Sequence, residues 1–310
     1  MRSQLTGVVP PLCTPFTPRG EVDTASLTSL VNRTLDAGAS ALFALGTSGE
    51  AAFLTDPQRR TVLETVAEAA AGRVPVLAGV IDMTTPRVLA HARTAAAAGA
   101  TALVATAPYY TGTHPAETAD HYRRIRAAVD LPLIAYDIPP AVHGKLPAAT
   151  LLALAEDRTL AGLKDSSGDL GSLRRLLVAL RERGLEDVFS VLTGSELTVD
   201  GALLGGAQGV VPGLGNVDPA GYVRLYEHAR AGRWPAAAAE QDRLAALFAL
   251  VDAGAGTPPG MSGSASALAG FKTALHLLGV IGHPATAAGY LLPEPAVRTV
   301  RALLAGAGLR

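Results

Sequence analysis

Residues 160–168 read LAGLKDSSG, a short apolar run that ends in a lysine and a polar turn. A continuous apolar run, without polar alternation, is typical of a strand that is buried on both faces of a parallel sheet. Such runs recur along the first two thirds of the chain, at spacings of about 20 to 34 residues. Together they are 7–10, 41–45, 74–79, 102–105, 131–135, 160–163, 188–192 and 209–211.

The stretches between these runs are long enough for helices. Thr85 followed by Pro86 predicts a helix N-cap and a first-turn proline. A glycine that can end a helix in the left-handed conformation precedes three of the runs, at Gly38, Gly99 and Gly206. Eight strand–helix units predict a (β/α)8 barrel. A doubly wound open sheet is the alternative, but it usually has fewer strands, and Gly-x-Gly-x-x-Gly does not follow the first run.

The predicted barrel occupies residues 1–232, and residues 233–310 form a helical extension. Apolar periodicity in the extension predicts three helices, over 235–250, 265–278 and 295–304. The segment 252–264 between the first two is rich in Gly, Pro and Ser and predicts a loop.

Composition narrows the class of protein. The chain has 310 residues, 49% hydrophobic residues and a net charge of −1, which favours a large core and excludes a basic stripe for nucleic acid. Its single cysteine, Cys13, cannot form an internal disulfide, so a cytoplasmic location is expected. The start has no signal-peptide pattern, and no window approaches the roughly 20 apolar residues of a membrane span. The seven histidines show no metal-ligand spacing.

Lysine is rare in this chain. Of the 26 lysine and arginine residues, only Lys145, Lys164 and Lys272 are lysines. Lys164 ends a predicted buried strand, where a primary amine could condense with a ketone and a guanidinium could not. Strand alternation would turn Asp165 to the opposite face and leave the amine unpaired. A solvated surface role is the alternative for Lys164; Lys145 is expected to be exposed, and Lys272 to be solvated or packed on a helix.

Reactive side chains follow several predicted strands, and barrel active sites lie at the carboxyl ends of strands. Lys164 would therefore share a rim with Thr47, Tyr110 and Tyr136. A phenol can carry protons when hydroxyls such as those of Thr47 and Tyr110 relay to it. The backbone and hydroxyls of the 46–50 loop, Gly-Thr-Ser-Gly-Glu, could hold a carboxylate. A buried ring with a satisfied hydroxyl is the alternative for either tyrosine, and 213–215 is interpreted as a plain turn.

The combination of these motifs resembles the dihydrodipicolinate synthase / N-acetylneuraminate lyase family. It comprises Gly46-Thr47-Ser48-Gly49-Glu50, Pro108-Tyr109-Tyr110, Tyr136-x-x-Pro139 and Gly162-x-Lys164-x-x-Ser167-Gly168, and the resemblance runs from about residue 7 to the C-terminus. It implies a (β/α)8 barrel with a helical C-terminal extension and a homotetramer built as a dimer of dimers. It implies no metal and no organic cofactor.

The resemblance also implies residue roles. Lys164 matches the lysine that forms a Schiff base with pyruvate, and Tyr136 matches the general acid and base. Thr47 and Ser48 match the pair that binds the carboxylate of the 2-oxo acid and relays protons. Tyr110 matches a tyrosine that reaches a neighbouring subunit's site. Two positions match the lining of the pyruvate pocket, Gly194 and Val211.

This chain departs from the synthase branch at four positions. Ala141 replaces the arginine that holds the aldehyde's carboxylate, and Asp137 replaces the usual asparagine. Met83 and Arg87 stand where bacterial synthases place an Asn and a Glu that bind regulatory lysine. The sequence therefore predicts a pyruvate-linked aldolase or lyase acting on a 2-keto-3-deoxy sugar acid or a related 2-oxo acid. The alternatives are dihydrodipicolinate synthase itself and a non-catalytic protein that binds a 2-oxo acid.

Overall fold

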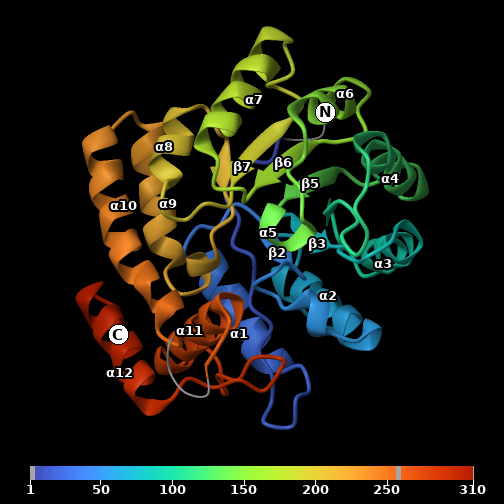
Figure 1. The fold of residues 1–310 in the computed structure, drawn as a ribbon. Helices are drawn as coiled ribbons and strands as arrows, with labels where there is room; N and C mark the ends of the chain where they lie inside the picture. The colour runs from blue at the N-terminus through green and yellow to red at the C-terminus, as the bar shows by residue number, and fades with distance from the viewer. Residues whose placement is uncertain (1–3, 256–259, 310) are drawn as a thin grey trace.

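Parallel strands form a single sheet at the centre of the molecule (Figure 1). The computed structural model describes residues 4–255 and 260–309. The eight strands are β1 (Gly7–Val8), β2 (Leu42–Ala44), β3 (Val76–Gly79), β4 (Ala102–Ala105), β5 (Leu133–Asp137), β6 (Gly162–Asp165), β7 (Ser190–Thr193) and β8 (Gly209–Val210). Each predicted run overlaps one of these strands, which confirms all eight predictions to within a few residues.

The sheet closes on itself. Its order is β1-β8-β7-β6-β5-β4-β3-β2, so β1 and β2 stand at the two ends of the order. A parallel bridge pairs Pro11, just beyond β1, with Phe43 in β2. Phe43 N donates to Pro10 O at 3.1 Å, and Leu12 N donates to Phe43 O at 2.8 Å. The chain is therefore a (β/α)8 barrel, as predicted.

Helices follow the strands and surround the barrel (Figure 1). Around the barrel lie α1 (Thr24–Asp36), α2 (Asp56–Ala70), α3 (Thr85–Ala97), α4 (Pro115–Ala128), α5 (Pro139–Val142), α6 (Ala148–Glu156), α7 (Leu170–Glu182), α8 (Val199–Leu204) and α9 (Pro219–Arg230). Short 3-10 helices are η1 (Ala51–Phe53), η2 (Gly213–Asn216) and η3 (Ala249–Asp252). None of the helices in the described ranges is long and apolar enough to cross a membrane.

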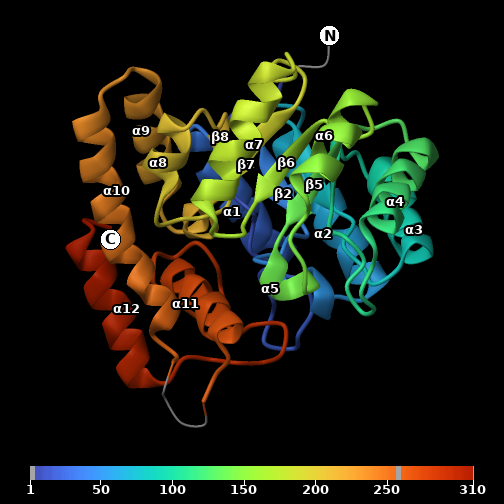
Figure 2. The same cartoon turned by 45° about the horizontal axis from the view of Figure 1, so that its top comes forward.

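The predicted C-terminal helices are present as α10 (Trp234–Phe248), α11 (Gly263–Leu277) and α12 (Glu294–Gly306). Figure 2 shows α11 and α5 beyond the strands on the same side of the barrel. The predicted loop over 252–264 lies partly outside the described residues, while its first residue belongs to η3 and its last two to α11. The division into two domains at residue 232 stays a prediction.

Two details of the helix ends test the sequence reasoning. The prediction of Thr85 as an N-cap was wrong by one residue, because Thr84 precedes α3 and the Thr85 hydroxyl instead bonds His121 Nδ1 at 2.8 Å. The three glycines before strands all have positive φ, from 90° to 105°. This left-handed geometry strains other residues, so the prediction of helix-ending glycines is confirmed.

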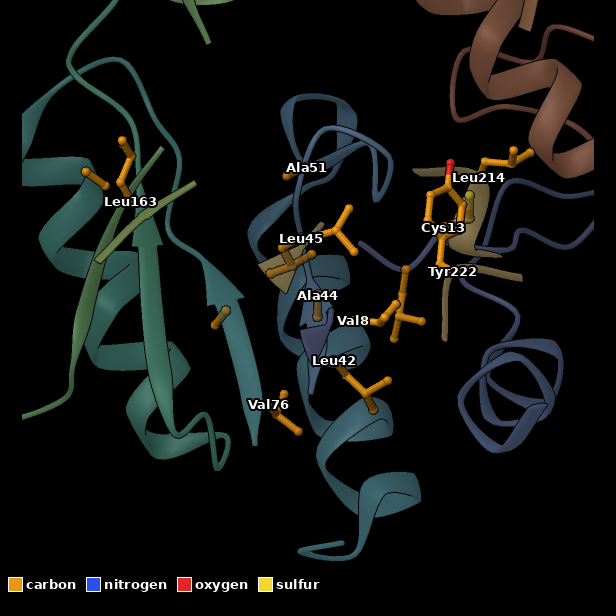
Figure 3. Packing of buried hydrophobic residues seen from close by; sticks show 14 of the residues in the cluster. Val8, Cys13, Leu42, Ala44, Leu45, Ala51, Val76, Leu163, Leu214 and Tyr222 are labelled. Atoms are coloured by element: carbon orange, nitrogen blue, oxygen red, sulfur yellow. The ribbon is translucent and has the colours of Figure 1, made fainter. Parts of the chain in front are cut away.

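Strand alternation divides the core into two layers. Inside the barrel, Phe43, Val104 and Tyr136 pack with other inward-facing side chains. Outside it, alternate strand residues pack against the helices, and Figure 3 shows Leu42 and Val76 among them. Because the inner layer fills the barrel, a site for a ligand has to form at its ends.

Candidate active site

Lys164 occupies the inner face of β6. Its side chain is 5% exposed, whereas its neighbour Leu163 packs in the outer layer. The Nζ atom lies 3.8 Å from the centroid of the Tyr136 ring and 5.1 Å from that of Phe43. Asp165 turns away, and its Oδ1 accepts a hydrogen bond from Ser167 N at 2.8 Å. Within residues 4–255 and 260–309 no salt bridge joins Lys164 to a carboxylate, as the alternation predicted.

Tyr136 stands beside Lys164 because β5 and β6 pair these two residues in register. The Tyr136 hydroxyl lies 3.2 Å from Thr47 Oγ1, and either oxygen can be the donor. Phe43 meets the Tyr136 ring edge-on, at an interplanar angle of 82°. The structure thus brings an amine, a phenol and a small hydroxyl together from three different strand ends.

Electrostatics favour proton exchange at Tyr136. Burial acts to raise the pKa of this phenol, but the charge of Lys164 and hydrogen bonds with Thr47, Lys164 and Ser166 outweigh it. The net effect is a pKa below the ordinary tyrosine value. A phenol that gives up its proton more easily is better suited to act as both acid and base near neutral pH.

The loop after β2 carries Thr47 and is bounded by unusual backbone. Leu45 and Glu50 have φ of 60° and 55°, although neither is glycine. Such conformations cost of order 1–3 kcal/mol and persist only when the surroundings hold them. Glu50 forms an ion pair with Lys272 from α11, and its Oε2 accepts from Ala287 N at 2.6 Å. The C-terminal extension therefore anchors the loop that carries Thr47.

Lys272 is buried completely on α11, so of the two predicted alternatives the solvated role is wrong and the packed one is confirmed. Its Nζ donates to Ala285 O at 3.1 Å and lies 4.2 Å from the Phe16 ring centroid. Burial lowers the pKa of Lys272, while the charge and hydrogen bond of Glu50 act to raise it. This pair could not be predicted from sequence, because its members are far apart along the chain and Lys272 lies on a largely apolar helix.

Two glycines make room in this part of the barrel, Gly194 beside Lys164 and Gly213 beside Ser48. A Cβ placed on Gly194 would lie 2.0 Å from Ser166 Oγ and 3.3 Å from Lys164 Cε. A Cβ on Gly213 would lie 3.3 Å from Ser48 Oγ, which places Ser48 beside the segment after β8. Val211 is 5% exposed and belongs to the inner layer. Three of the residues predicted to bind substrate thus lie near the reactive pair. Thr47 is bonded to Tyr136, Gly194 lies beside Lys164, and Val211 belongs to the same inner layer as Tyr136.

Glu196 was not singled out by the sequence, although it lies two residues beyond Gly194. Its Oε1 accepts from Leu214 N at 2.5 Å. Burial raises the pKa of Glu196 to about 7, against the hydrogen bond from Leu214 N, the charge of Lys164 and the hydrogen bond from Gly213 N. Ser166 was also missed as a partner of Tyr136; its place in the turn after Lys164 was the only signal for it.

Other predicted residues lie away from this cluster. Tyr110 is 80% exposed, so within one chain it does not complete the predicted relay with Thr47 and Tyr136. Ala141, in α5, is exposed. Lys145 is exposed as predicted, but its amine contacts Asp137 and Ser167.

Arg87, one of the two positions that the resemblance matched to a regulatory pocket, belongs to an ion-pair cluster. Arg87 Nε donates to Asp82 Oδ2 at 2.8 Å, and His91 Nε2 lies 2.8 Å from the same oxygen. The pKa of Asp82 is lowered: burial opposes this, but hydrogen bonds from His91, Met83 N and Arg87 prevail. Met83 itself is 40% exposed.

The chain resembles known proteins over most of its length. A profile of the Dihydrodipicolinate synthetase family matches residues 4–286. A protein of Halobacterium salinarum named as an uncharacterized DapA-like lyase is 37% identical over 264 residues, which are 85% of this chain and 84% of the relative. A 4-hydroxy-tetrahydrodipicolinate synthase of Exiguobacterium sibiricum is 35% identical over 245 residues, 78% and 82% of the two chains.

A solved structure has the same fold. YagE, a prophage protein of the dihydrodipicolinic acid synthase family from E. coli K12, was determined in complex with pyruvate. It is 26% identical, superposes with a TM-score of 0.89, and the match covers 99% of each chain. Because the family profile and relatives above 30% identity both span most of this sequence, the chain belongs to the dihydrodipicolinate synthetase family and is an enzyme of the class I aldolase and lyase type.

Proposed function

We propose that this enzyme makes or breaks a carbon–carbon bond of a 2-keto-3-deoxy sugar acid, or a related 2-oxo acid, through an imine between Lys164 and pyruvate. One observation carries the proposal. The Lys164 amine is buried beside the ring of Tyr136, and the Tyr136 hydroxyl is bonded to Thr47. The complex of YagE with pyruvate supports the choice of the 2-oxo acid.

In this mechanism the Lys164 amine adds to the keto carbon of pyruvate, and loss of water gives a protonated imine. The imine cation accepts the electron pair released when the methyl group loses a proton, and an enamine results. The enamine carbon then bonds to the carbonyl carbon of an aldehyde, and hydrolysis of the new imine frees Lys164. Cleavage is the reverse sequence.

The neighbours have separate tasks. Tyr136 gives and takes the protons of the addition and dehydration steps, with Thr47 as its relay. Thr47 and Ser48 bind the pyruvate carboxylate, and Gly194 and Val211 leave space for pyruvate. Tyr110 acts in the site of a neighbouring subunit, which its exposure in the single chain allows.

Borohydride trapping tests the imine. Reduction in the presence of pyruvate should increase the mass of Lys164 by that of pyruvic acid minus one oxygen atom. Trypsin does not cleave after a modified lysine, so the adduct should appear on the peptide 159–174, and the free peptide 159–164 should disappear. Lys164→Arg is the matched control, because it keeps the charge and cannot form the imine. An adduct on another lysine, or none at all, would refute the proposal.

The acceptor is proposed from Ala141. An arginine that binds a carboxylate contributes about 1.5–3 kcal/mol, and a methyl group supplies none of this. We therefore expect kcat/KM for pyruvate with aspartate semialdehyde to be on the order of 10- to 100-fold below that of the best keto-deoxy acid. Pyruvate release from a panel of keto-deoxy sugar acids measures one side, and condensation with aspartate semialdehyde the other.

Dihydrodipicolinate synthase remains the second candidate, because curated relatives such as that of Exiguobacterium sibiricum have the corresponding name. Efficient turnover of aspartate semialdehyde would establish it. A non-catalytic binding protein would form the pyruvate adduct but turn over neither group of substrates.

We further propose a cytoplasmic homotetramer arranged as a dimer of dimers. Sedimentation equilibrium should then give about four times the chain mass of 31.6 kDa. A monomer would remove the basis for the role proposed for Tyr110.

A further inference from the structure

Lys145 lies at the outer face of the strand ends that carry Tyr136 and Lys164. Its Nζ donates to Asp137 Oδ2 at 2.8 Å and to Ser167 Oγ at 2.7 Å. The same nitrogen lies 3.7 Å from Asp165 Oδ2. One amine thus reaches side chains from β5 and from β6 and its following turn.

The two carboxylates are the direct neighbours of the site residues in sequence. Asp137 follows Tyr136, Asp165 follows Lys164, and the sheet register pairs Asp137 with Asp165. Because side chains alternate along a strand, the two carboxylates face outward where the phenol and the amine face inward. A contact that joins Asp137 to Asp165 on the outer face therefore also fixes the distance between Tyr136 and Lys164 on the inner face.

This arrangement depends on a cation. Asp137 is 1% exposed and Asp165 5%, so both carboxylates are largely removed from water. Burial raises the pKa of Asp137, and the charge of Asp165 adds to that effect. The hydrogen bond from Lys145, the hydrogen bond from Leu146 N and the charge of Lys145 act to lower it. Asp169, the N-cap of α7, is a further charged group near Lys145. Without Lys145, two buried like charges would face each other, a cost that is relieved when the strand ends separate or one carboxyl takes up a proton.

Lys145 also closes the segment that leaves β5. That segment contains α5, and its return is fixed where Leu146 N donates to Asp137 Oδ1 at 3.1 Å. The lysine and the residue after it therefore bind the same carboxylate. Figure 2 shows α5 beyond the ends of the strands, on the side of α11.

We propose that Lys145 is a positioning residue, which clamps the ends of β5 and β6 through Asp137, Ser167 and Asp165 and so sets Tyr136 against the Lys164 amine. The inference rests on the proposed function of Lys164 and Tyr136. Lys145 does not touch the substrate; it acts on the proton transfers that form and hydrolyse the imine.

The test compares Lys145→Met with the wild type. Methionine keeps an unbranched apolar stem and removes the cation. We expect kcat and the rate of borohydride-trapped pyruvate adduct formation on Lys164 to fall about 10- to 100-fold, as for a small misplacement of reacting groups. The KM for pyruvate should change less than about threefold, because the loop that binds the carboxylate is untouched.

Two further variants make the result specific. Asp137→Asn in the Lys145→Met background removes the uncompensated buried charge and keeps an acceptor for Leu146 N. It should recover at least half of the loss on a logarithmic scale but stay below the wild-type rate, because the cation that joins the two strands is still missing. Arg123→Met is the matched control, because it removes a cation from a solvent-exposed pair with Asp157. It should leave kcat unchanged.

The outcomes separate the two proposals. No adduct in the wild type refutes the proposed function, whereas a normal adduct with a fully active Lys145→Met variant refutes only the clamp. A double variant no more active than Lys145→Met would also refute it. If Lys145→Met does not fold, Lys145→Arg and the double variant decide the question. The clamp requires that Lys145→Arg forms the adduct and that the double variant forms it more slowly than the wild type. A double variant as fast as the wild type refutes it.

Discussion

The position of Lys164 follows from a rule as simple as strand alternation. A lysine at the end of an apolar run, with an acidic residue directly after it, places amine and carboxylate on opposite faces. The structure has Lys164 beside Tyr136 and Asp165 beside Ser167 and Lys145. The same rule would have pointed to Asp137, but its partner Lys145 belongs to a segment with no regular period, so sequence alone could not pair them.

Glu196 gives a prediction at the residue scale. Its pKa is raised from 4.5 to about 7, so between these values the folded protein binds a proton that the unfolded chain has lost. The free energy of unfolding therefore falls with rising pH: the contribution of Glu196 to stability is complete below pH 4.5 and is lost as the pH rises toward 7. Relative to Glu196→Gln, wild-type stability should fall by about 1–3 kcal/mol between pH 5 and pH 8.

Urea denaturation of the two proteins at both pH values measures this change. The glutamine variant serves as the baseline, because it cannot titrate and shares every other ionisable group. An equal difference between the two proteins at pH 5 and pH 8 would show that Glu196 ionises at an ordinary pKa.

Regulation by lysine is the second prediction at this scale. Arg87 pairs with Asp82, and the buried Arg59 donates to Ile81 O at 2.7 Å, so cations already occupy the region that the resemblance matched to a lysine pocket. A further ammonium group should be repelled, and excess L-lysine should leave kcat/KM unchanged. Inhibition of the wild type that is equally strong in Arg87→Ala would contradict the prediction, because lysine would then bind regardless of the cations.

At the scale of elements, the strands were predictable because each must be apolar on both faces. Helix ends were less so: Thr84 and Thr85 are equally suitable N-caps in sequence, and a tertiary bond to His121 decides between them. The ion pair of Glu50 with Lys272 could not be predicted, since it depends on how α11 packs against the loop after β2. The pattern of apolar residues therefore predicts strands and helices, but it does not predict contacts between residues that are far apart along the chain.

Gly162 makes a testable case for a close approach between strands. A Cβ at this position in β6 would lie 2.5 Å from Ser190 O in β7, a backbone atom that cannot rotate away. Gly162→Ala should lower the free energy of unfolding by about 1–3 kcal/mol, as overpacked sites do. Because Gly162 lies two residues before Lys164, adduct formation with pyruvate should slow as well.

Chemical denaturation provides the measurement, with Gly112→Ala as its control. Gly112 has open space around its Cα and a backbone that accepts alanine, so stability should stay the same or rise slightly. Equal stabilities of Gly162→Ala and the wild type would mean that β6 and β7 can separate locally without cost.

On the scale of the whole molecule, the barrel and the C-terminal extension meet at the catalytic face. Thr47 lies in a loop whose last residue, Glu50, has left-handed backbone and is held by groups from the extension. The boundary predicted at residue 232 therefore divides the barrel from the helices that follow it in sequence. Yet groups beyond this boundary hold the loop that carries Thr47. A barrel expressed without residues 233–310 should lose this support.

Lys272→Met tests that dependence. Removing one member of a buried ion pair leaves Glu50 as an unpaired charge, and the expected loss of stability is about 3–5 kcal/mol. Glu50→Gln in the same background should recover part of this loss, because glutamine is neutral and can still accept from Ala287 N. Arg298→Met, which removes an exposed cation from α12, should change stability by less than about 1 kcal/mol.

The KM for pyruvate supplies a second readout. If the ion pair of Lys272 with Glu50 holds the loop, this KM should rise in Lys272→Met and return toward normal in the double variant. A loss of stability with unchanged KM would limit the pair to a structural role, and stability equal to the wild type would show that the extension does not support the loop at all.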